Sequence, residues 1–349
     1  MNNISTYLEY RSDITFKQSP FNEADAIILS MLIGLDYEGV LTGRMPIKEV
    51  YDKYRESAMT DEKDDRYHEK EEVFFACAES LRFGKIELEN YVKLIDKEDE
   101  VTFYALTIHI GREAYVAFRG TDGSLLSWKE NFRTLYEKPT RGQYEALKYL
   151  TKAASKPFTK VSVLGHSKGG NLVVYAAMSL DSKLQKKIKK VYAFDAPGFI
   201  DDISDNLGYL NIEDRIEAYV PESAVIGNLM RPPFNRKVVK GIGTGLFQHD
   251  MFNWITTADG LKLTEDTNAY SKDVSERANG WIESIKPEDR KRVVDELFSV
   301  FEKNGIDHIG DLIHMDLKKI LSLIKCLTSL SSENRELLGI VIKQVRQSH

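Results

Sequence analysis

Hydrophobic and polar positions change their spacing along the chain, and these changes indicate its elements. Residues 22–35 (NEADAIILSMLIGL) begin with polar capping residues and continue apolar on nearly every side, which predicts a helix buried in the core. Residues 101–110 and 113–120 are rich in β-branched and aromatic residues and are joined by the dipeptide Gly-Arg, which predicts a β-hairpin. Residues 51–72 are dense in charges of both signs, and we expect a solvated helix or loop there.

The middle of the chain alternates between helix and strand patterns. Apolar residues at helical spacing occupy about 127–154, around a break at Pro139, and again 171–180. The strand-like runs are VSVLG from Val161, VYAFD ending at Asp195, a run ending near Pro221, and KVV before a glycine-rich loop. This order predicts an α/β protein with a mostly parallel central sheet flanked by helices and with the hairpin at its start.

Beyond about residue 285 the pattern is helical throughout. Three segments carry apolar residues three and four positions apart: VVDELFSVF, IGDLIHMDLKKILSLIKCL and NRELLGIVIKQV. Pro287 and its acidic neighbours indicate a boundary. We therefore expect an α/β domain over 1–284 and a C-terminal helical module over 285–349, whose helices are the candidate docking surface for a protein partner.

Composition narrows the range of partners. The 349 residues carry a net charge of −6 and a pI near 5.8, so there is no broad basic field, and a nucleic-acid partner is not expected. Cys77 and Cys326 lie far apart without metal-ligand spacing, which favours buried thiols in a reducing compartment. Neither G-x-G-x-x-G nor G-x-x-x-x-G-K-[ST] occurs, and we expect no metal and no organic cofactor.

The N-terminus gives an expectation about location. The segment MNNISTYLEYRSD lacks the basic and apolar regions of a secretory signal. No window holds the roughly eighteen apolar residues that a membrane-spanning helix needs. We therefore expect a cytoplasmic protein without a transmembrane segment, with leaderless export as the alternative.

One short motif carries candidate chemistry. Residues 165–169 (GHSKG) match G-x-S-x-G, in which a serine occupies a strained strand-to-helix turn and its hydroxyl projects above the carboxyl edge of the sheet. Side chains at the two glycine positions would collide with the neighbouring strand and helix. An apolar strand precedes the motif and an apolar helix follows it, as the motif requires. Ser167 is therefore the candidate nucleophile, and an ordinary turn is the alternative.

A nucleophilic serine needs a base, and histidine is the usual one. In this fold class the order is serine, acid, histidine, and four of the seven histidines follow Ser167 at a distance. His308 and His314 fall in the helical module, and a third is the terminal residue, where order is not expected. His249 remains, on a loop after the KVV strand, as the candidate base. The alternative is a surface loop histidine.

Two carboxylates compete for the role of the acid. Asp195 ends the strand VYAFD before a sharp Ala-Pro-Gly turn, and Glu222 ends the next strand in YVPES. We favour Asp195 because an aspartate directly at a strand end is the shorter and more rigid orienter of an imidazole. For each carboxylate, the alternative is a role in stabilising a turn.

Acyl transfer also needs two donors for the developing oxyanion. The backbone amide of Lys168, directly after the nucleophile, is the first candidate. Thr121, at the end of AYVAFRGT, is the second because it offers an amide and a hydroxyl, and Gly120 before it lets the backbone approach closely. The alternative for RGTDG is a simple turn.

Two segments together resemble the class 3 lipase branch of the α/β-hydrolases: VAFRGTDGSLLSWKENF and VSVLGHSKGGNLVVYAA. In that branch an FRGT-like element supplies the oxyanion hole and GHSxGG the nucleophile. A bacterial lipase-like family of unassigned function is similar over roughly residues 7–255, also at YLEYRSDITFKQSPFNEADAIILSMLIGLDYEG, YAFDAPGF, YVPESAVIG and QHDMFNW. The resemblance does not extend beyond about residue 285.

The resemblance implies an α/β-hydrolase fold and a role for each candidate residue. The implied set is Ser167 as nucleophile, His249 as base, Asp195 as acid, and Thr121 and Lys168 as oxyanion donors. Class 3 lipases place an aspartate after the strand that here ends in Val-Pro, where this chain has Glu222 instead. The aspartate of YAFDAP is placed as in pancreatic-type lipases, where the acid follows the earlier strand.

These residues predict a serine hydrolase that cleaves a small-molecule or lipid carboxylic ester through an acyl-enzyme, without a cofactor. One alternative is a catalytically silent binding or regulatory module with the same fold. Another is a serine thioesterase or acyltransferase. The sequence does not give the acyl-chain length, and we expect any lid at 199–215 or near 51–72.

Overall fold

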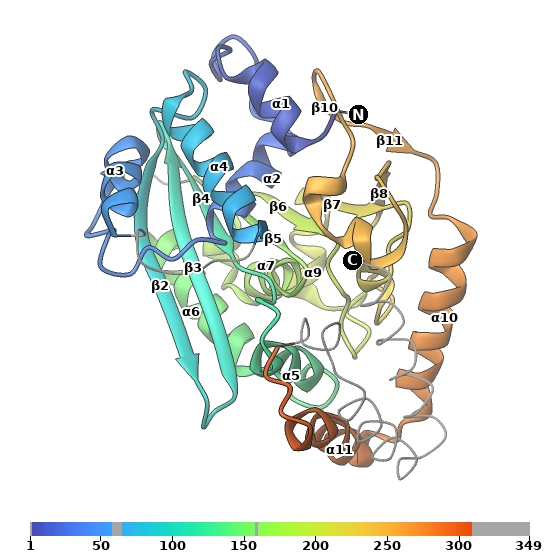
Figure 1. Cartoon of the computed structure of the whole chain (residues 1–349). Coiled ribbons are helices and arrows are strands. Elements are labelled where there is room, and N and C mark those ends of the chain that lie inside the picture. Colours follow the sequence, from blue (N-terminus) through green and yellow to red (C-terminus); the bar gives the residue numbers. More distant parts are fainter. Residues whose placement is uncertain (1, 58–64, 158–159, 309–349) are drawn as a thin grey trace.

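The computed structural model describes residues 2–57, 65–157 and 160–308, which form a layered α/β structure (Figure 1). Within these ranges, the central sheet has nine strands in the order β1-β2-β3-β4-β5-β6-β7-β8-β11. The strands are β1 (Met45–Pro46), β2 (Glu87–Asp96), β3 (Val101–Ile110), β4 (Glu113–Phe118), β5 (Lys160–His166), β6 (Ile188–Phe194), β7 (Ile216–Pro221), β8 (Arg236–Val239) and β11 (Leu263–Thr264). A separate pair joins β9 (Thr256–Thr257) to β10 (Gly260–Leu261).

The sheet is mixed, which corrects the expectation of a mostly parallel one. Strands β4 to β8 pair in parallel, whereas β1 to β4 pair antiparallel and β11 is antiparallel to β8. The predicted hairpin is present as β3 and β4, with Ile110 opposite Glu113. Strand β2 is not predicted from the sequence. Its residues, ELENYVKLID, alternate between apolar and charged types, so it lacks the continuous apolar run of a strand that is buried on both faces.

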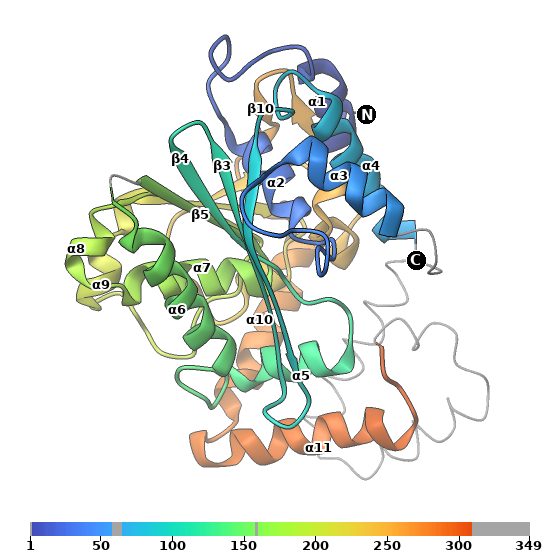
Figure 2. The same cartoon turned by 90° about the vertical axis from the view of Figure 1, so that its left-hand side faces the viewer.

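Helices cover both faces of the sheet (Figure 2). One face carries α1 (Ile4–Arg11), α2 (Glu23–Leu32), α3 (Ile47–Ser57) and α4 (Asp65–Glu79), and the other carries α6 (Arg141–Ser155), α7 (Lys168–Ser179), α8 (Ser182–Gln185) and α9 (Leu207–Leu210). Along β4, Tyr115 and Ala117 pack into the first core, whereas Ala114, Val116 and Phe118 pack into the second. This period of two explains why a strand apolar at every position suits a sheet covered on both sides.

The predicted buried helix is α2, in which every residue from Ala24 onward is buried. Its start is a capping box: the side chain of Asn22 accepts from the amide of Asp25 at 3.1 Å, and the Asp25 carboxylate accepts from the amide of Asn22 at 3.0 Å. The charged stretch 51–72 contributes to α3 and α4, where Tyr54 is buried, and residues 58–64 of that stretch lie outside the described residues.

The chain after the sheet continues into α10 (Ala269–Ser284) and α11 (Arg290–Lys303). Helix α11 packs against α5 (Leu125–Arg133), with the rings of Phe132 and Phe298 5.3 Å apart, in a third core. Residues 309–349, with His314, Cys326 and both of the last two predicted helices, lie outside the described residues, so the division at 284/285 stays a prediction. In the part of the chain that is described, no helix is long and apolar enough to cross a membrane.

Candidate active site

Ser167 lies in the sharp turn between β5 and α7, where the motif predicts it. Its backbone φ of 55° and ψ of −124° fall outside the regions that side-chain-bearing residues normally occupy. The Ser167 amide donates to the carbonyl of Phe194, at the end of the neighbouring β6, at 2.9 Å. The turn is therefore strained and is held by the sheet beside it.

The two glycines of the motif leave room for this turn. A Cβ on Gly165 would meet the backbone of Gly169 across the turn, and a Cβ on Gly169 would meet the carbonyl of Phe118 at the end of β4. Helix α7 can therefore begin directly against the sheet only because both positions lack a side chain.

His249 and Asp195 are brought together from separate loops. His249 ends the short 3-10 helix η3 (Gly245–His249), and its Nδ1 lies 2.6 Å from Oδ2 of Asp195. Asp195 directly follows β6, is almost completely buried, and accepts a second hydrogen bond at Oδ1 from the amide of Gly227 at 3.0 Å. Since the carboxylate accepts, Nδ1 of His249 is a protonated nitrogen, and in the tautomer that this contact favours Nε2 is the acceptor.

Glu222, the competing carboxylate, has different partners. Its Oε2 accepts from Nζ of Lys240 at 2.7 Å, and its Oε1 accepts from the amide of Gly241 at 3.4 Å. These contacts are consistent with the turn-stabilising alternative. The structure therefore places Asp195, rather than Glu222, against the imidazole of His249.

The elbow and the histidine loop meet through His166, the residue before the serine. Nε2 of His166 donates to the backbone carbonyl of His249 at 2.8 Å, and the two ring centroids are 4.4 Å apart. Desolvation of its ring and then the neighbouring His249 hold the pKa of His166 well below its usual range, so this ring is neutral near pH 7. Among the described residues, no partner is hydrogen-bonded to the Ser167 hydroxyl, so its pairing with His249 stays a prediction.

The predicted oxyanion loop lies against the elbow. A Cβ on Gly120 would come within 2.7 Å of the carbonyl of His166 and within 3.4 Å of Cβ of Ser167. Thr121 follows, and its hydroxyl accepts from Nδ2 of Asn131 in α5 at 3.3 Å. The close approach expected at Gly120 is therefore present, and it places Thr121 one residue from the point of contact.

The side chain of Lys168 forms a buried ion pair that the sequence argument did not anticipate. While its amide begins α7, its Nζ donates to Oε2 of Glu130 at 2.6 Å and to the carbonyl of Thr102 at 2.7 Å. Lys168 is 4% and Glu130 3% exposed. The available signal was the lysine itself, because a cation in the first turn of an apolar helix needs a buried partner.

His308 lies nearer to the candidate site than its sequence position predicts. Its Nε2 lies 3.2 Å from the carbonyl of Asp122, directly after Thr121, and it forms an isolated bridge with Ser124. His308 therefore contacts the α/β structure, although the sequence predicts it in a separate module. Asp195, the candidate acid, nevertheless contacts His249.

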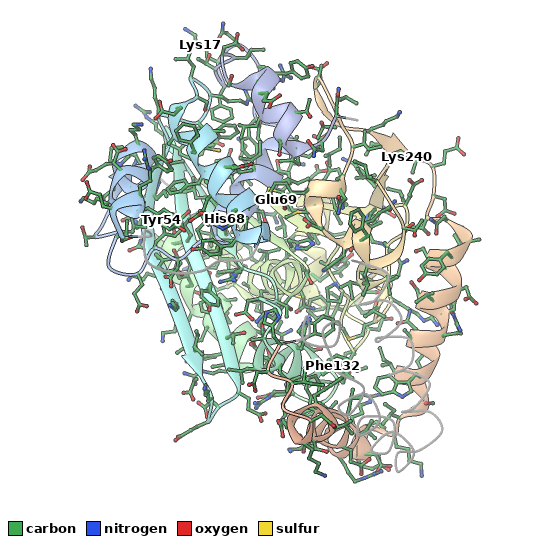
Figure 3. The ribbon with its side chains drawn as sticks, viewed as in Figure 1. Lys17, Tyr54, His68, Glu69, Phe132 and Lys240 are labelled. Atoms are coloured by element: carbon green, nitrogen blue, oxygen red, sulfur yellow. The ribbon has the colours of Figure 1, made fainter. Side chains whose placement is uncertain are left out.

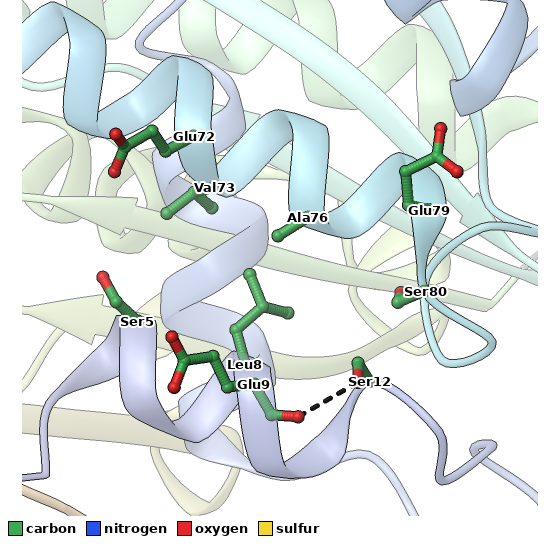
Figure 4. Close-up of a pocket in the computed structure, with 9 residues that line it drawn as sticks. All are labelled: Ser5, Leu8, Glu9, Ser12, Glu72, Val73, Ala76, Glu79 and Ser80. Carbon is green, nitrogen blue, oxygen red and sulfur yellow. Dashed lines mark hydrogen bonds between the residues drawn. The ribbon is translucent and has the colours of Figure 1, made fainter.

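A different hollow is visible between α1 and α4 (Figure 4). It has a volume of about 370 Å³, with Leu8, Val73 and Ala76 along it and the carboxylates of Glu72 and Glu79 beside them. No candidate catalytic residue lines it. Across the described ranges, no group of three or more histidine, cysteine or acidic residues is arranged to hold a metal ion.

A family model described as Mbeg1-like matches residues 77–299. No curated protein matches the chain. Among solved structures, M37 lipase is similar with a TM-score of 0.40 and 14% identity over 60% of this chain and 70% of that one. Lip2 lipase from Yarrowia lipolytica is similar with a TM-score of 0.32 and 14% identity over 52% of this chain and 72% of that one.

Proposed function

We propose that this chain, which belongs to the Mbeg1-like family, is a serine hydrolase that cleaves carboxylic esters. Ser167 is the nucleophile, His249 the general base and acid, and Asp195 the group that orients the imidazole. The amides of Thr121 and Lys168 receive the oxyanion. The observation that carries the proposal is the 2.6 Å contact between His249 and Asp195, beside a serine held in the strained backbone of a nucleophile elbow.

In the proposed reaction, Nε2 of His249 takes the proton of the Ser167 hydroxyl as Oγ attacks the ester carbonyl. Asp195 stabilises the imidazolium that forms, through the hydrogen bond at Nδ1. The two amides stabilise the tetrahedral oxyanion, and Nε2 then returns the proton to the leaving alcohol. A water molecule, deprotonated by the same histidine, attacks the acyl-enzyme and releases the acid and Ser167.

Labelling with a fluorophosphonate, followed by intact mass, tests the activated serine. We expect one adduct on the wild type and none on Ser167→Ala, because only a deprotonated hydroxyl attacks phosphorus rapidly. Hydrolysis of p-nitrophenyl esters should fall by roughly 10⁶-fold in the same variant. Ser5→Ala, at an exposed serine of α1, is the matched control and should label as the wild type does.

A folded wild type that takes no label would favour the silent binding module over the hydrolase. The thioesterase alternative is separated by comparing an ester and a thioester of the same acyl group. A kcat/KM for the thioester that exceeds the ester value by more than their intrinsic difference in reactivity would reassign the substrate class but keep the catalytic residues.

A further inference from the structure

An apolar cavity of about 120 Å³ is lined by residues of α5 and α10 and of the loops between β6 and η3. None of the described residues that line it is charged. Its walls are mainly aromatic and aliphatic, and include Trp128, Phe132, Leu246, Met230, Ala278 and Trp281. Figure 3 labels Phe132, which lies on α5. Such a lining favours an apolar ligand over a charged or strongly polar one.

The loops that hold the candidate catalytic residues also form the near wall of this cavity. Pro197 lies two residues after Asp195, and Leu246 belongs to the same short helix as His249. Ile226 precedes Gly227, whose amide donates to Asp195. The lining therefore shares its loops with Asp195 and His249, although neither of these residues is itself part of it.

The oxyanion loop reaches the cavity from the other side. Asn131 lines the cavity and donates from Nδ2 to the hydroxyl of Thr121 at 3.3 Å. Thr134, the hydroxyl side chain of the lining, donates to the carbonyl of Asn131 at 2.6 Å. The amide and the hydroxyl side chain are thus engaged with neighbouring residues, and the rest of the lining is aliphatic, aromatic or indole.

The far wall is fixed to the loop after β7. The amide of Met230 donates to Oδ1 of Asn279 in α10 at 2.8 Å, and Nδ2 of Asn279 donates to the carbonyl of Asn228 at 2.9 Å. Since both bonds join α10 to this loop, this wall of the cavity is held in place by the helix. A preformed wall discriminates between ligands of different length.

We propose that this cavity binds the acyl chain of the substrate and that it selects short chains of about four to six carbons. The proposal rests on the proposed function, because the chain must extend from a carbonyl held at Ser167. The volume sets the length: a dry cavity of about 150 Å³ accepts benzene, with six carbons, so about 120 Å³ suits four to six.

The test is a series of p-nitrophenyl esters from acetyl to palmitoyl. We expect kcat/KM to rise about fourfold for each methylene as far as the hexanoyl ester, because each buried methylene contributes its transfer free energy. Longer chains should gain nothing further and should fall at least tenfold by the palmitoyl ester. A flat profile, or one that rises to palmitoyl, would overturn the proposal.

A substitution that fills the cavity gives the sharper comparison. Ala278→Leu adds three carbons at a buried position of the lining and should lower the hexanoyl-to-acetyl ratio of kcat/KM at least tenfold. Ala269→Leu makes the same change on the exposed first turn of α10, outside the cavity, and should keep the wild-type ratio. An unchanged ratio in a folded Ala278→Leu protein would contradict the assignment. If Ala278→Leu fails to fold, Ala278→Val, which adds two carbons, serves in its place.

Direct binding separates a failure of this proposal from a failure of the proposed function. Hexanamide and acetamide are titrated against Ser167→Ala by tryptophan fluorescence, which reports on the cavity because Trp128 and Trp281 line it. We expect hexanamide to bind at least tenfold more tightly, and Ala278→Leu to remove most of the difference. Binding of hexanamide without ester turnover would support the acyl-chain cavity and contradict the hydrolase proposal. Ester turnover without any dependence on chain length would support the hydrolase and contradict the cavity proposal. The absence of both binding and turnover would contradict both proposals.

Discussion

At the residue scale, Asp195 lies in an unusual backbone conformation. Its φ of 41° lies in the left-handed region, which aspartate adopts more readily than most residues. Its two carboxylate oxygens are used separately, one by the amide of Gly227 and one by the ring of His249. Such a group holds the imidazole in one tautomer and one orientation, which is the role proposed for it.

Replacing each carboxylate in turn tests which one is the acid. Asp195→Asn should lower kcat for p-nitrophenyl esters by about 10⁴-fold, because the amide no longer enforces the tautomer with a free Nε2. Glu222→Gln should lower it by less than about tenfold, since Glu222 pairs with Lys240 rather than with His249. Steady-state kinetics on folded proteins decides, and a larger loss in Glu222→Gln would reverse the assignment.

At the element scale, the start of α7 is tied to α5 and β3 by one buried ion pair. Lys168 in the first turn of α7 reaches Glu130 in α5, and both contact Thr102 in β3. The amide proposed as an oxyanion donor belongs to the same lysine. The pair therefore joins the helix that begins directly after Ser167 to a helix that lines the apolar cavity.

Breaking the ion pair between Lys168 and Glu130 should first of all lower the free energy of unfolding, rather than act directly on catalysis. Glu130→Gln leaves the Lys168 ammonium buried without its counter-charge, and we expect the free energy of unfolding to fall by about 3–5 kcal/mol in urea titrations. Glu276→Gln makes the same change in the exposed pair with Arg231 and should have a much smaller effect. A similar loss in the two variants would show that burial of the pair matters little.

At the scale of the whole molecule, the described part of the chain after residue 284 packs onto the α/β structure. Phe298 of α11 is buried against Phe132 of α5, and the amide of Leu125 donates to the carbonyl of Asp307 at 2.8 Å. The family match also runs across the predicted boundary, from 77 to 299. These contacts favour unfolding of α11 together with the sheet.

A core substitution in α11 tests that coupling. Phe298→Ala should lower the free energy of unfolding by about 3–5 kcal/mol and shift one cooperative transition that both far-ultraviolet and near-ultraviolet circular dichroism report. Leu207→Ala, at a side chain that is 78% exposed, is the control and should leave the transition nearly unchanged. Two separate transitions, only one of which moves in Phe298→Ala, would instead support an independent C-terminal module.

The sequence by itself determined the features that depend on neighbours along the chain. The elbow at Ser167, the hairpin of β3 and β4 and the buried helix α2 follow from spacing, capping and glycine positions, so a short window is enough to recognise them. Elimination among a few histidines also led to His249, which lies beside Asp195.

Only the tertiary structure decided what depends on residues far apart in the chain. It put Asp195, and not Glu222, in contact with His249, paired Lys168 with Glu130, and showed how strands at both edges make the sheet mixed. It also formed the apolar cavity from α5 and α10, whose residues Phe132 and Ala278 no sequence pattern links. The physical reason is that partner choice and cavity shape depend on how packed elements meet, whereas periodicity reports only which face of each element is buried.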